Sequence, residues 1–526
     1  MHRLRLVVSS LLVTALAGTT ARAADVPVAD VDALLQAIAA AQPGDTIVLA
    51  AGEYEVHQSK IACEAAGTAD APIVVRAAEP GAAKLRFDAV EGFHVRAPFW
   101  RFEGLDIEGI CAADSDCEHA FHVTGAASGT HIVGNRLHGF NAMIKGNGEP
   151  IGPNMAYEHP DDVVVEYNEF FNEAPRDTGN PVTPIDVVGG QRWIVRGNFI
   201  HDHAKGGGDG ISYAAFLKGH SKDGLIERNL VVCELLHSGQ VRLGLSLGGG
   251  GSGPDMICED GACKPEHERG IVRNNLILNC PADVGIYVNA GADSKILNNT
   301  LYNTGGVDMR FAETTGVVHN NLMNGKIRDR DGAVTDKQNN LVEATLEQFA
   351  AWFADPAAQD FTLVDGAAFV DLGLAVPEVT DDYCGNDRND GAPDIGAIEY
   401  DGEGCNGGLP VPGGSGGETT TTGDPTGGDP TGDPTTGGDT SGDPGEPTGG
   451  PTTANPSGTS GETSSGEPTG GATTQPGTDG GSATAGDTSP GVDDDSGCGC
   501  RSDAPASGPL ALLALAGLLR RRRRHS

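Results

Sequence analysis

The sequence predicts an all-β chain whose short strands stack into successive coils, the architecture of a parallel β-helix. Seven segments share the pattern apolar-x-x-Asn-x-apolar, and the intervals between successive asparagines run from 22 to 46 residues. Short segments of two-residue alternation that end in turn residues suit one coil per repeat. The shortest interval is too short for two parallel strands joined by a full helix, so an α/β repeat is excluded.

The asparagines of the repeat are predicted to form corners of the coils. They are Asn135, Asn168, Asn198, Asn229, Asn275, Asn299 and Asn321. Stacked coils lie about 4.8 Å apart, so asparagines at one corner can hydrogen-bond along the stack as a ladder. We therefore interpret them as structural rather than catalytic. A β-sandwich is the rival fold but gives no reason for this register, and the leucine scaffold of a leucine-rich repeat is missing. The longest insertion falls between Asn229 and Asn275.

The N-terminal residues predict export. Arg3 and Arg5 precede an apolar run over residues 6–17 that is too short to span a bilayer, and Ala21-Arg22-Ala23 fits a cleavage site. We interpret residues 1–23 as a signal peptide and residues 24–405 as the β-helix domain. Residues 31–41 have helical spacing and precede a turn and a strand over 42–54, so we expect an N-terminal helix that caps the open stack.

The C-terminal part divides into a closing segment, a stalk and a tail. Residues 345–356 predict a short helix near the C-terminal end of the domain. Residues 406–497 are Gly, Thr, Pro, Ser and Asp repeats without Lys or Arg, so they predict a disordered linker that acts as a stalk. Residues 498–526 join Cys498-Gly-Cys500 to an apolar run over 509–519 and five arginines, which predicts a sorting or anchor segment that alone meets the membrane.

Cysteine usage and charge restrict the setting and the partners. Of the 11 cysteines, the body holds Cys63, Cys111, Cys117, Cys233, Cys258, Cys263, Cys280, Cys384 and Cys405. Disulfides fit an exported chain, and the odd number leaves one body cysteine unpaired. Cys111 with Cys117 and Cys258 with Cys263 could close small loops, whereas Cys384 and Cys405 bracket the end of the body. The formal net charge of −38 makes nucleic acid an unsuitable partner.

The strand that follows each asparagine corner carries the candidate functional residues. These strands hold Lys145, Asp186, Asp209, Lys218, Arg242, Tyr287, Asn289, Asp308 and Arg310. A purely structural face would be rich in Thr, Ser and Val, so mixed Lys, Arg and Asp indicate a binding or catalytic face. The alternative interpretation is that these charges serve solubility alone.

The helix, the segment "PGDTIVLAAGEY" and the coil repeat resemble the right-handed parallel β-helix of pectin, alginate and chondroitin lyases, over about residues 25–402. The order Lys218, Asn229, Arg242 resembles the catalytic stretch of chondroitinase-B-like polysaccharide lyases. That resemblance implies that Lys218 removes the proton beside a uronate carboxylate and that Arg242 holds that carboxylate or assists the leaving oxygen. A fixed cation stabilises the negative charge that develops.

Further roles follow from proximity to that stretch. We expect His220 to be the acid, and Arg310, Asn289, Tyr287 and His237 to bind substrate. Members of the family that use calcium place several acids near the lysine, and here Asp186 and Asp209 are the candidate calcium ligands. Two carboxylates are few for an ion that prefers six to eight oxygens.

The tail has a resemblance of its own. Its cysteines, short apolar run and terminal arginines resemble the MYXO-CTERM sorting tail of myxobacterial surface proteins. This implies processing near Cys498 or Cys500 by a sorting protease or anchor machinery, and retention at the outer cell surface.

Three functions follow, in order of preference. The first is a surface-displayed lyase that cleaves an acidic, uronate-containing polysaccharide by β-elimination. The second is a non-catalytic glycan-binding, adhesin or structural surface protein. A hydrolase is third, because it needs two carboxylates that flank one bond, whereas Asp186, Asp209 and Asp308 are scattered over several coils. An acidic protein needs a local basic groove to hold a polyanion, which Lys218, Arg242 and Arg310 would supply.

Overall fold

The computed structural model describes residues 25–400 apart from 58, 152–155, 250–251, 254–256 and 389–390, and it also describes Cys405. The predicted signal peptide (1–23), linker (406–497) and tail (498–526) lie outside these described residues. Within the described part, neither α-helix combines the length and the apolar character that a membrane crossing requires.

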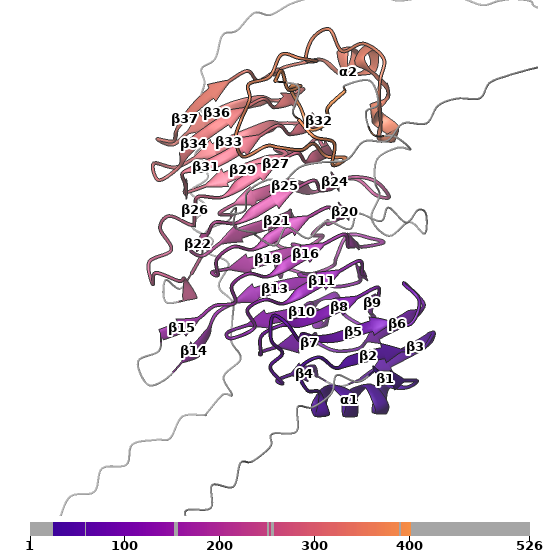
Figure 1. The fold of residues 1–526 in the computed structure, drawn as a ribbon. Coiled ribbons are helices and arrows are strands. Elements are labelled where there is room, and N and C mark those ends of the chain that lie inside the picture. The colour runs from indigo at the N-terminus through magenta and orange to yellow at the C-terminus, as the bar shows by residue number, and fades with distance from the viewer. Residues whose placement is uncertain are drawn as a thin grey trace, which may run out of the picture. The chain divides into compact units, whose positions relative to one another are not determined.

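Three parallel sheets make up the stack, and each coil contributes one strand to each sheet in turn (Figure 1). Sheet 1 contains β1 (Asp25–Val28), β2 (Thr46–Leu49), β5 (Ile73–Ala77), β8 (Trp100–Glu103), β11 (His131–Val133), β16 (Val164–Glu166), β19 (Ile194–Arg196), β23 (Leu225–Glu227), β27 (Ile271–Arg273), β31 (Ser294–Leu297), β34 (Thr315–His319) and β37 (Val334–Gln338). Sheet 2 contains β3 (Gly52–Val56), β6 (Ala83–Phe87), β9 (Asp106–Gly109), β12 (Arg136–His138), β17 (Glu169–Phe171), β20 (Phe199–His201), β24 (Leu230–Val232), β28 (Leu276–Cys280), β32 (Thr300–Thr304) and β35 (Leu322–Met323). Sheet 3 contains β4 (Ile61–Cys63), β7 (Glu91–Val95), β10 (His119–Thr124), β13 (Ile144–Asn147), β18 (Ile185–Val188), β21 (Ile211–Lys218), β25 (Val241–Leu247), β29 (Ile286–Asn289), β33 (Gly306–Arg310) and β36 (Lys326–Arg330). The predicted parallel β-helix is confirmed.

Shorter strands lie outside these three sheets. They are the antiparallel pair β14 (Glu149–Ile151) and β15 (Ala156–Glu158), the parallel set β22 (Ser221–Lys222), β26 (His267–Glu268) and β30 (Gly291–Ala292), and the antiparallel pair β38 (Phe353–Asp355) and β39 (Asp360–Leu363). Short 3-10 helices cover Asp114–Asp116 and Pro356–Ala358.

The asparagine ladder forms as predicted, between sheets 1 and 2. Each side-chain Nδ2 from Asn135 to Asn321 donates to Oδ1 of the asparagine on the next coil at 2.9–3.1 Å, and Asn340 receives the last of these bonds. The same amides also bond backbone groups of neighbouring coils, such as the Val195 carbonyl that accepts from Asn229 at 2.9 Å. These buried backbone groups therefore find partners where the chain turns between two sheets.

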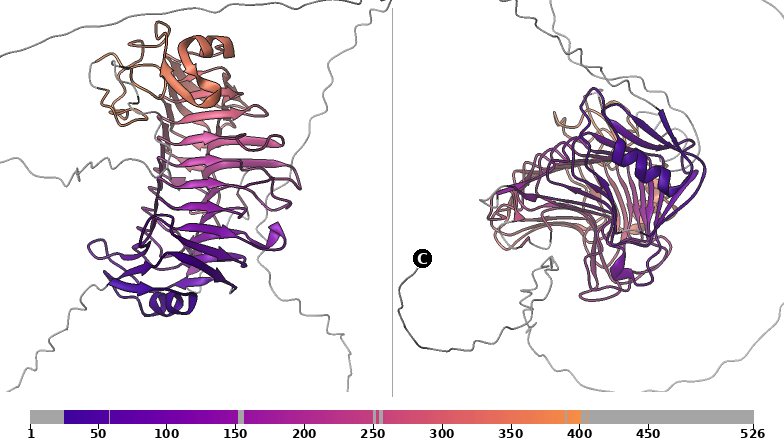
Figure 2. Two further views of the ribbon diagram at one scale, coloured as in Figure 1. Left: turned by 90° about the vertical axis from the view of Figure 1, so that its right-hand side faces the viewer. Right: turned by 90° about the horizontal axis from the view of Figure 1, so that it is seen from below.

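Helices lie at both ends of the stack. α1 (Val31–Ala40) lies across the first coils, buries Leu34 and Ile38, and begins at Asp30, whose side chain accepts from the Ala33 amide at 2.8 Å (Figure 2). The predicted N-terminal cap is therefore confirmed. α2 (Leu346–Trp352) is shorter than the predicted helix over 345–356, because the chain enters β38 directly after Trp352.

The C-terminal segment after the last coil packs on the outer face of sheet 2. Phe349, Phe353 and Phe369 form one buried cluster with Leu230, Leu276 and Tyr302 of that sheet. The C-terminal segment therefore covers this face.

Four disulfides join the described cysteines. Cys111–Cys117, Cys258–Cys263 and Cys384–Cys405 match the groupings expected from the sequence, and Cys233–Cys280 links neighbouring coils. The unpaired body cysteine is Cys63, which is buried.

Candidate functional site

The outer face of sheet 3 collects most of the predicted site residues. The β-ladder register aligns His94, His122, Lys145, Asp186, Phe216, Ser246, Tyr287 and Asp308 in one row across successive strands, which we call the first row. A second row lies two residues further along the strands and includes Val188, Lys218, Asn289 and Arg310. In-register stacking brings together residues far apart in the sequence, because each coil adds one side chain to each row.

Lys145, Asp186 and Lys218 form a charged group on neighbouring strands of this face. The Lys145 ammonium donates to Asp186 Oδ1 at 2.8 Å, and both residues are buried. Lys218 Nζ lies 4.5 Å from the centroid of the Phe216 ring. Burial raises the pKa of Asp186, but the charges of Lys145 and Lys218 outweigh it and lower that pKa below its ordinary value. The group therefore combines two lysines with one ionised carboxylate.

Three predicted substrate-binding residues meet further along the same face. Asn289 Nδ2 and Arg310 Nη1 both donate to the Tyr287 hydroxyl oxygen, each at 3.4 Å. Burial raises the pKa of Tyr287, so its hydroxyl stays protonated at neutral pH. Arg310 Nε also donates to Asp331 at 2.5 Å.

Arg242 is not placed beside Lys218, which corrects the predicted pairing. Its strand position lies opposite Ser212, six residues before Lys218 on β21, so the two positions are about 20 Å apart along the strand direction. Arg242 is 1% exposed, and it donates to the carbonyl oxygens of Gly239 at 2.9 Å and His237 at 3.0 Å. The physical reason is the loop 233–240, which folds over the start of β25 and uses the guanidinium as its internal hydrogen-bond donor.

His237 belongs to that loop rather than to the two rows on sheet 3. Its Nδ1 accepts from Arg242 Nη2 at 2.9 Å, and its Nε2 lies 3.1 Å from the Asn172 carbonyl. The structure therefore does not bring His237 together with Tyr287, Asn289 and Arg310.

His220 occupies the turn directly after β21. It has a positive φ of 61°, and its Nδ1 lies 2.9 Å from the Pro265 carbonyl and 3.4 Å from Asp260 Oδ2. It is thus at the Lys218 end of the strand, in contact with the loop that carries Cys258–Cys263.

The predicted calcium ligands are not brought together. Asp186 pairs with Lys145, whereas Asp209 precedes β21, is half exposed and accepts from Lys205 Nζ at 2.6 Å. Phe216, the residue opposite Asp186, lies near the far end of β21, five residues after its start at Ile211 and thus about 16 Å along the strand from the end near Asp209. These two carboxylates do not fit one calcium ion.

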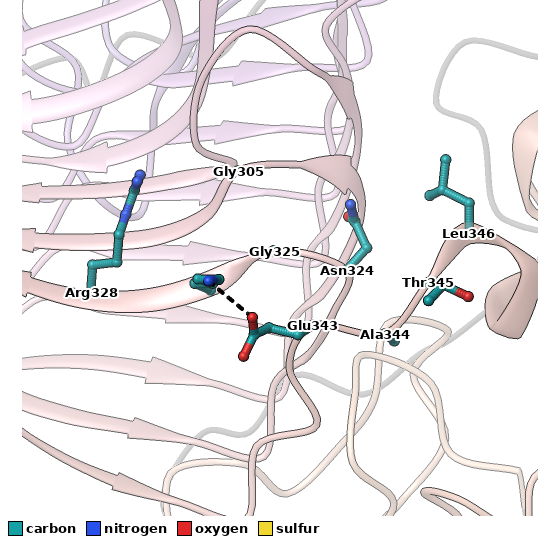
Figure 3. Close-up of a pocket in the computed structure, with 9 residues that line it drawn as sticks. Gly305, Asn324, Gly325, Arg328, Glu343, Ala344, Thr345 and Leu346 are labelled. Atoms are coloured by element: carbon teal, nitrogen blue, oxygen red, sulfur yellow. Dashed lines mark ion pairs between the residues drawn. The ribbon is translucent and has the colours of Figure 1, made fainter. Parts of the chain in front are cut away.

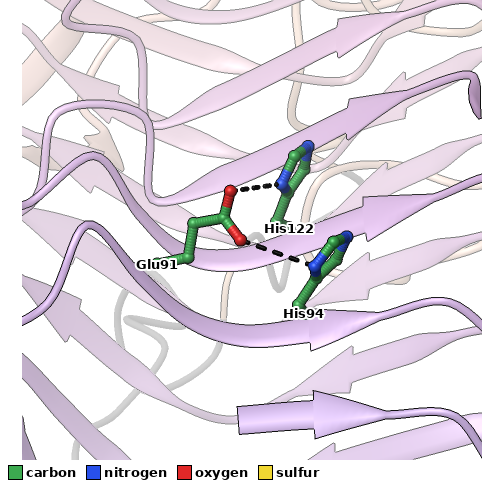
Figure 4. Close-up of side chains that lie close together, drawn as sticks. All are labelled: Glu91, His94 and His122. Atoms are coloured by element: carbon green, nitrogen blue, oxygen red, sulfur yellow. Dashed lines mark hydrogen bonds and ion pairs between the residues drawn. The ribbon is translucent and has the colours of Figure 1, made fainter. Parts of the chain in front are cut away.

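A polar cluster on β7 and β10 was not predicted from the sequence. Glu91 Oε1 lies 3.0 Å from His122 Nδ1, and Glu91 Oε2 lies 3.5 Å from His94 Nδ1 (Figure 4). Burial raises the pKa of Glu91, but the hydrogen bond and charge of His122, with the charges of His94 and Lys60, lower it to about 2. Burial lowers the pKa of His94 to about 4. The repeated sequence Phe-His-Val at 93–95 and 121–123 was the available signal for this cluster.

One cavity lies at the last coils. It has a volume of about 520 Å³ and is lined by residues that include Asn324, Lys326, Arg328, Glu343 and Leu346 (Figure 3). Lys326 Nζ and Glu343 Oε1 form an ion pair across it at 3.0 Å. β36 is four strands away from β21 in sheet 3, so the cavity lies roughly 20 Å from Lys218 along the stack.

Comparison with known proteins gives one partial family match. A model of the Chondroitinase B family matches residues 28–143, which carry α1, the first coils and the Glu91–His94–His122 cluster, but end before Lys145. No curated protein matches this chain.

Several solved structures match this chain at low identity. The pectate lyase Pel9A is 16% identical over 69% of this chain and 90% of its own, with a TM-score of 0.46. An alginate lyase from Paenibacillus sp. str. FPU-7 is 18% identical over 61% of this chain and 99% of its own, with a TM-score of 0.36. The GH136 lacto-N-biosidase from Eubacterium ramulus is 12% identical over 61% of this chain and 68% of its own, with a TM-score of 0.38. These likenesses assign no reaction to any residue of this chain.

Proposed function

We propose that this chain is a polysaccharide lyase that cleaves an acidic, uronate-containing polysaccharide on the outer face of sheet 3. The observation that carries the proposal is the line of basic groups on this face: Lys145 and Lys218 flank Asp186, and Arg310 follows further along. In a chain with net charge −38, such a local basic track is what a polyanion needs in order to bind. The partial Chondroitinase B match supports the same class of substrate.

The proposed reaction is β-elimination with Lys218 as the base. Its neutral amine takes the proton from the carbon beside the uronate carboxylate. The electron pair left behind forms the new double bond as the bond to the leaving oxygen breaks, and that oxygen takes a proton from an acid. Lys145 replaces Arg242 as the cation nearest the base, because both lysines act on the Asp186 carboxylate. His220, two residues after Lys218, is the proposed acid.

Tyr287, Asn289 and Arg310 would bind an adjacent part of the polymer. They lie two to three strands from Lys218 in the register, which corresponds to about 10–14 Å along the stack. A linear polymer that runs along the stack would therefore meet the base and this group at the same time. Arg310 supplies the charge that a carboxylate needs, and the Tyr287 hydroxyl supplies a neutral donor.

The test is the ultraviolet absorbance of unsaturated uronate while the purified chain is incubated with alginate, pectate, chondroitin and hyaluronan, with and without calcium. We expect a rise with at least one polymer and a loss of about 100-fold or more in rate for Lys218→Ala. Lys222→Ala is the matched control, because Lys222 lies on β22 and pairs with Glu268 instead. A flat trace on every polymer would reject the lyase, and an active Lys218→Ala variant would reject the assigned base.

A second function is favoured by one specific observation. Because Arg242 is buried under its own loop, the face lacks the arginine that the resemblance pairs with the base. A non-catalytic glycan-binding or adhesin role would then use the same basic track. Retained binding to an acidic polysaccharide in a pull-down, together with a flat absorbance trace, would establish it.

We also propose that the protein is exported and displayed on the outer cell surface. The support is the signal-peptide pattern of residues 1–23, the linker over 406–497 and the tail over 498–526. Removal of residues 498–526 should release the protein into the medium, whereas the full chain should stay with the cells and be accessible to added protease. Retention of the truncated chain would contradict the anchor.

A further inference from the structure

We propose that Glu91, His94 and His122 form a binding site for a divalent transition-metal ion, with Zn²⁺ as the probe. One ligand atom from each of the three side chains lies within 4.8 Å of the others (Figure 4). They come from the adjacent strands β7 and β10 on the outer face of sheet 3. The proposal does not depend on the lyase assignment.

The hydrogen bonds around His122 fix which ring nitrogen can bind a metal. Asn147 Nδ2 donates to the Gly148 carbonyl at 3.0 Å, so Asn147 presents its Oδ1 to His122 Nε2 at 2.8 Å. An amide oxygen can only accept, so Nε2 carries a proton and is not free to bind a metal. The other ring nitrogen, Nδ1, faces Glu91 Oε1 at 3.0 Å, and a metal ion bound there would replace the proton of that hydrogen bond.

Nε2 of His94 is held by a different pair of residues. The Thr124 hydroxyl donates to Glu149 Oε1 at 2.6 Å, so its oxygen accepts from His94 Nε2 at 3.1 Å. The lone pair of His94 is therefore on Nδ1, which accepts from Lys60 and lies 3.5 Å from Glu91 Oε2. Outer hydrogen bonds that hold Nε2 of two histidines in this way are typical of metal ligands.

Glu91 Oε2 and His94 Nδ1 are two neighbouring acceptor atoms that need a cation. Glu91 Oε2 is buried and has no hydrogen-bond partner. A buried carboxylate beside an imidazole lone pair is repelled unless a positive charge lies near both. In this structure the ammonium of Lys60 is that charge, because its Nζ lies 2.7 Å from His94 Nδ1 and 3.7 Å from Glu91 Oε2.

A metal ion can displace the Lys60 ammonium group. Its side chain is 42% exposed, so the ammonium can move into solvent when a metal ion takes over its contacts with His94 and Glu91. The two imidazole rings are nearly parallel, 11° apart with centroids separated by 4.8 Å, so a bound ion requires their Nδ1 atoms to tilt toward a common point. Zn²⁺ and the neighbouring divalent transition metals prefer imidazole nitrogen with carboxylate, whereas calcium prefers oxygen alone.

The test measures Zn²⁺ binding by competition with a chromophoric chelator and Co²⁺ binding by its visible absorption. Every sample is the full chain with Cys498→Ser and Cys500→Ser, which removes the tail thiols as competing ligands. We expect one Zn²⁺ per chain, a Zn²⁺-dependent rise in the unfolding temperature, and a loss of about 100-fold in affinity for His122→Ala.

Two further variants separate a metal site from a structural cluster. Lys60→Ala keeps all three ligands and removes the competing ammonium, so it should bind Zn²⁺ at least about 10-fold more tightly. His319→Ala is the matched control, because His319 pairs with Asp336 at 3.1 Å on sheet 1, away from the cluster. The absence of a saturable site, unchanged binding in His122→Ala, or no gain in Lys60→Ala would each overturn the proposal.

Discussion

Charged side chains on the outer faces of the sheets are paired with their neighbours on adjacent coils. On sheet 1, Glu227 is fully buried and lies between Arg196 and Arg273, each at 2.5 Å. On sheet 3, Lys145 pairs with Asp186 in the same manner. Stacked side chains lie only about 4.8 Å apart, so like charges in one row would repel each other. Where positive and negative side chains alternate along the row, neighbouring charges attract each other instead.

His138 predicts a pH dependence of stability. Burial lowers its pKa, but hydrogen bonds to Asp106 at 3.2 Å and Glu173 at 2.8 Å outweigh it and raise the pKa to about 9. The stabilisation is therefore complete below the ordinary histidine pKa of about 6.5 and is lost as pH rises through about 9. We expect the wild-type chain to lose about 2 kcal/mol of unfolding free energy over this window relative to His138→Gln, discounted because Glu173 is 61% exposed. Urea denaturation at pH 6 and pH 10 measures it, and equal losses in the two proteins would contradict the assignment.

Individual residues show where inference from the sequence stops. The sequence correctly assigned Lys145, Asp186, Lys218, Tyr287, Asn289 and Arg310 to one face, although each lies on the second strand after an asparagine corner, beyond a short strand of sheet 2. It misplaced Arg242, because nothing in the local sequence shows that the loop 233–240 folds over β25. It missed His94 and His122, because only the stacking of β7 on β10 brings them together.

The asparagine ladder makes a prediction at the scale of elements. Asn229 accepts from the backbone and side chain of Asn198, each at 2.9 Å, and donates to Asn275 and Val195. Asn229→Ala leaves several buried partners unsatisfied, so we expect a loss on the order of 3 kcal/mol in unfolding free energy. Asn340→Ala, at the half-buried end of the ladder, should lose about 1 kcal/mol in the same urea experiment. Equal losses would show that the ladder acts only locally.

The disulfides make a second prediction at this scale. Cys233–Cys280 closes a sequence separation of 47 residues, whereas Cys258–Cys263 closes one of 5. Loop-closure entropy predicts that the double alanine variant of the first pair loses about 4 kcal/mol, and that of the second about 2 kcal/mol. Thermal unfolding of both variants beside the wild type measures the difference, and a larger loss for the short loop would contradict it.

For the molecule as a whole, the sequence predicted the stack of coils but not the packing of the C-terminal segment on sheet 2. The asparagine register and the N-terminal cap follow from local patterns, so coil order and α1 could be expected in advance. The packing of Phe349 and Phe369 on sheet 2 could not, because it joins residues far apart in the sequence, such as Tyr302 and Phe349, without a shared motif.

That covering leads to a prediction for the whole molecule. A chain that ends at residue 340 would uncover Leu230, Leu276, Leu278 and Tyr302 on sheet 2, all now buried. Such a contiguous apolar patch promotes association, so we expect the shortened chain to bind a hydrophobic dye and to aggregate in light scattering. A chain that ends at residue 405 is the control and should do neither.

The coil-to-coil disulfide also has a mechanical consequence. Each coil of a solenoid contacts only its neighbours, so a chain pulled from its C-terminal end would peel away one coil at a time. Once Cys280 comes under tension, the pull passes through the sulfur bridge to Cys233, and the residues between them carry no load. The disulfide therefore protects β25, β26 and β27 from the pulling force. If flowing fluid pulls on a protein held at its tail, these strands cannot be extended into a tether.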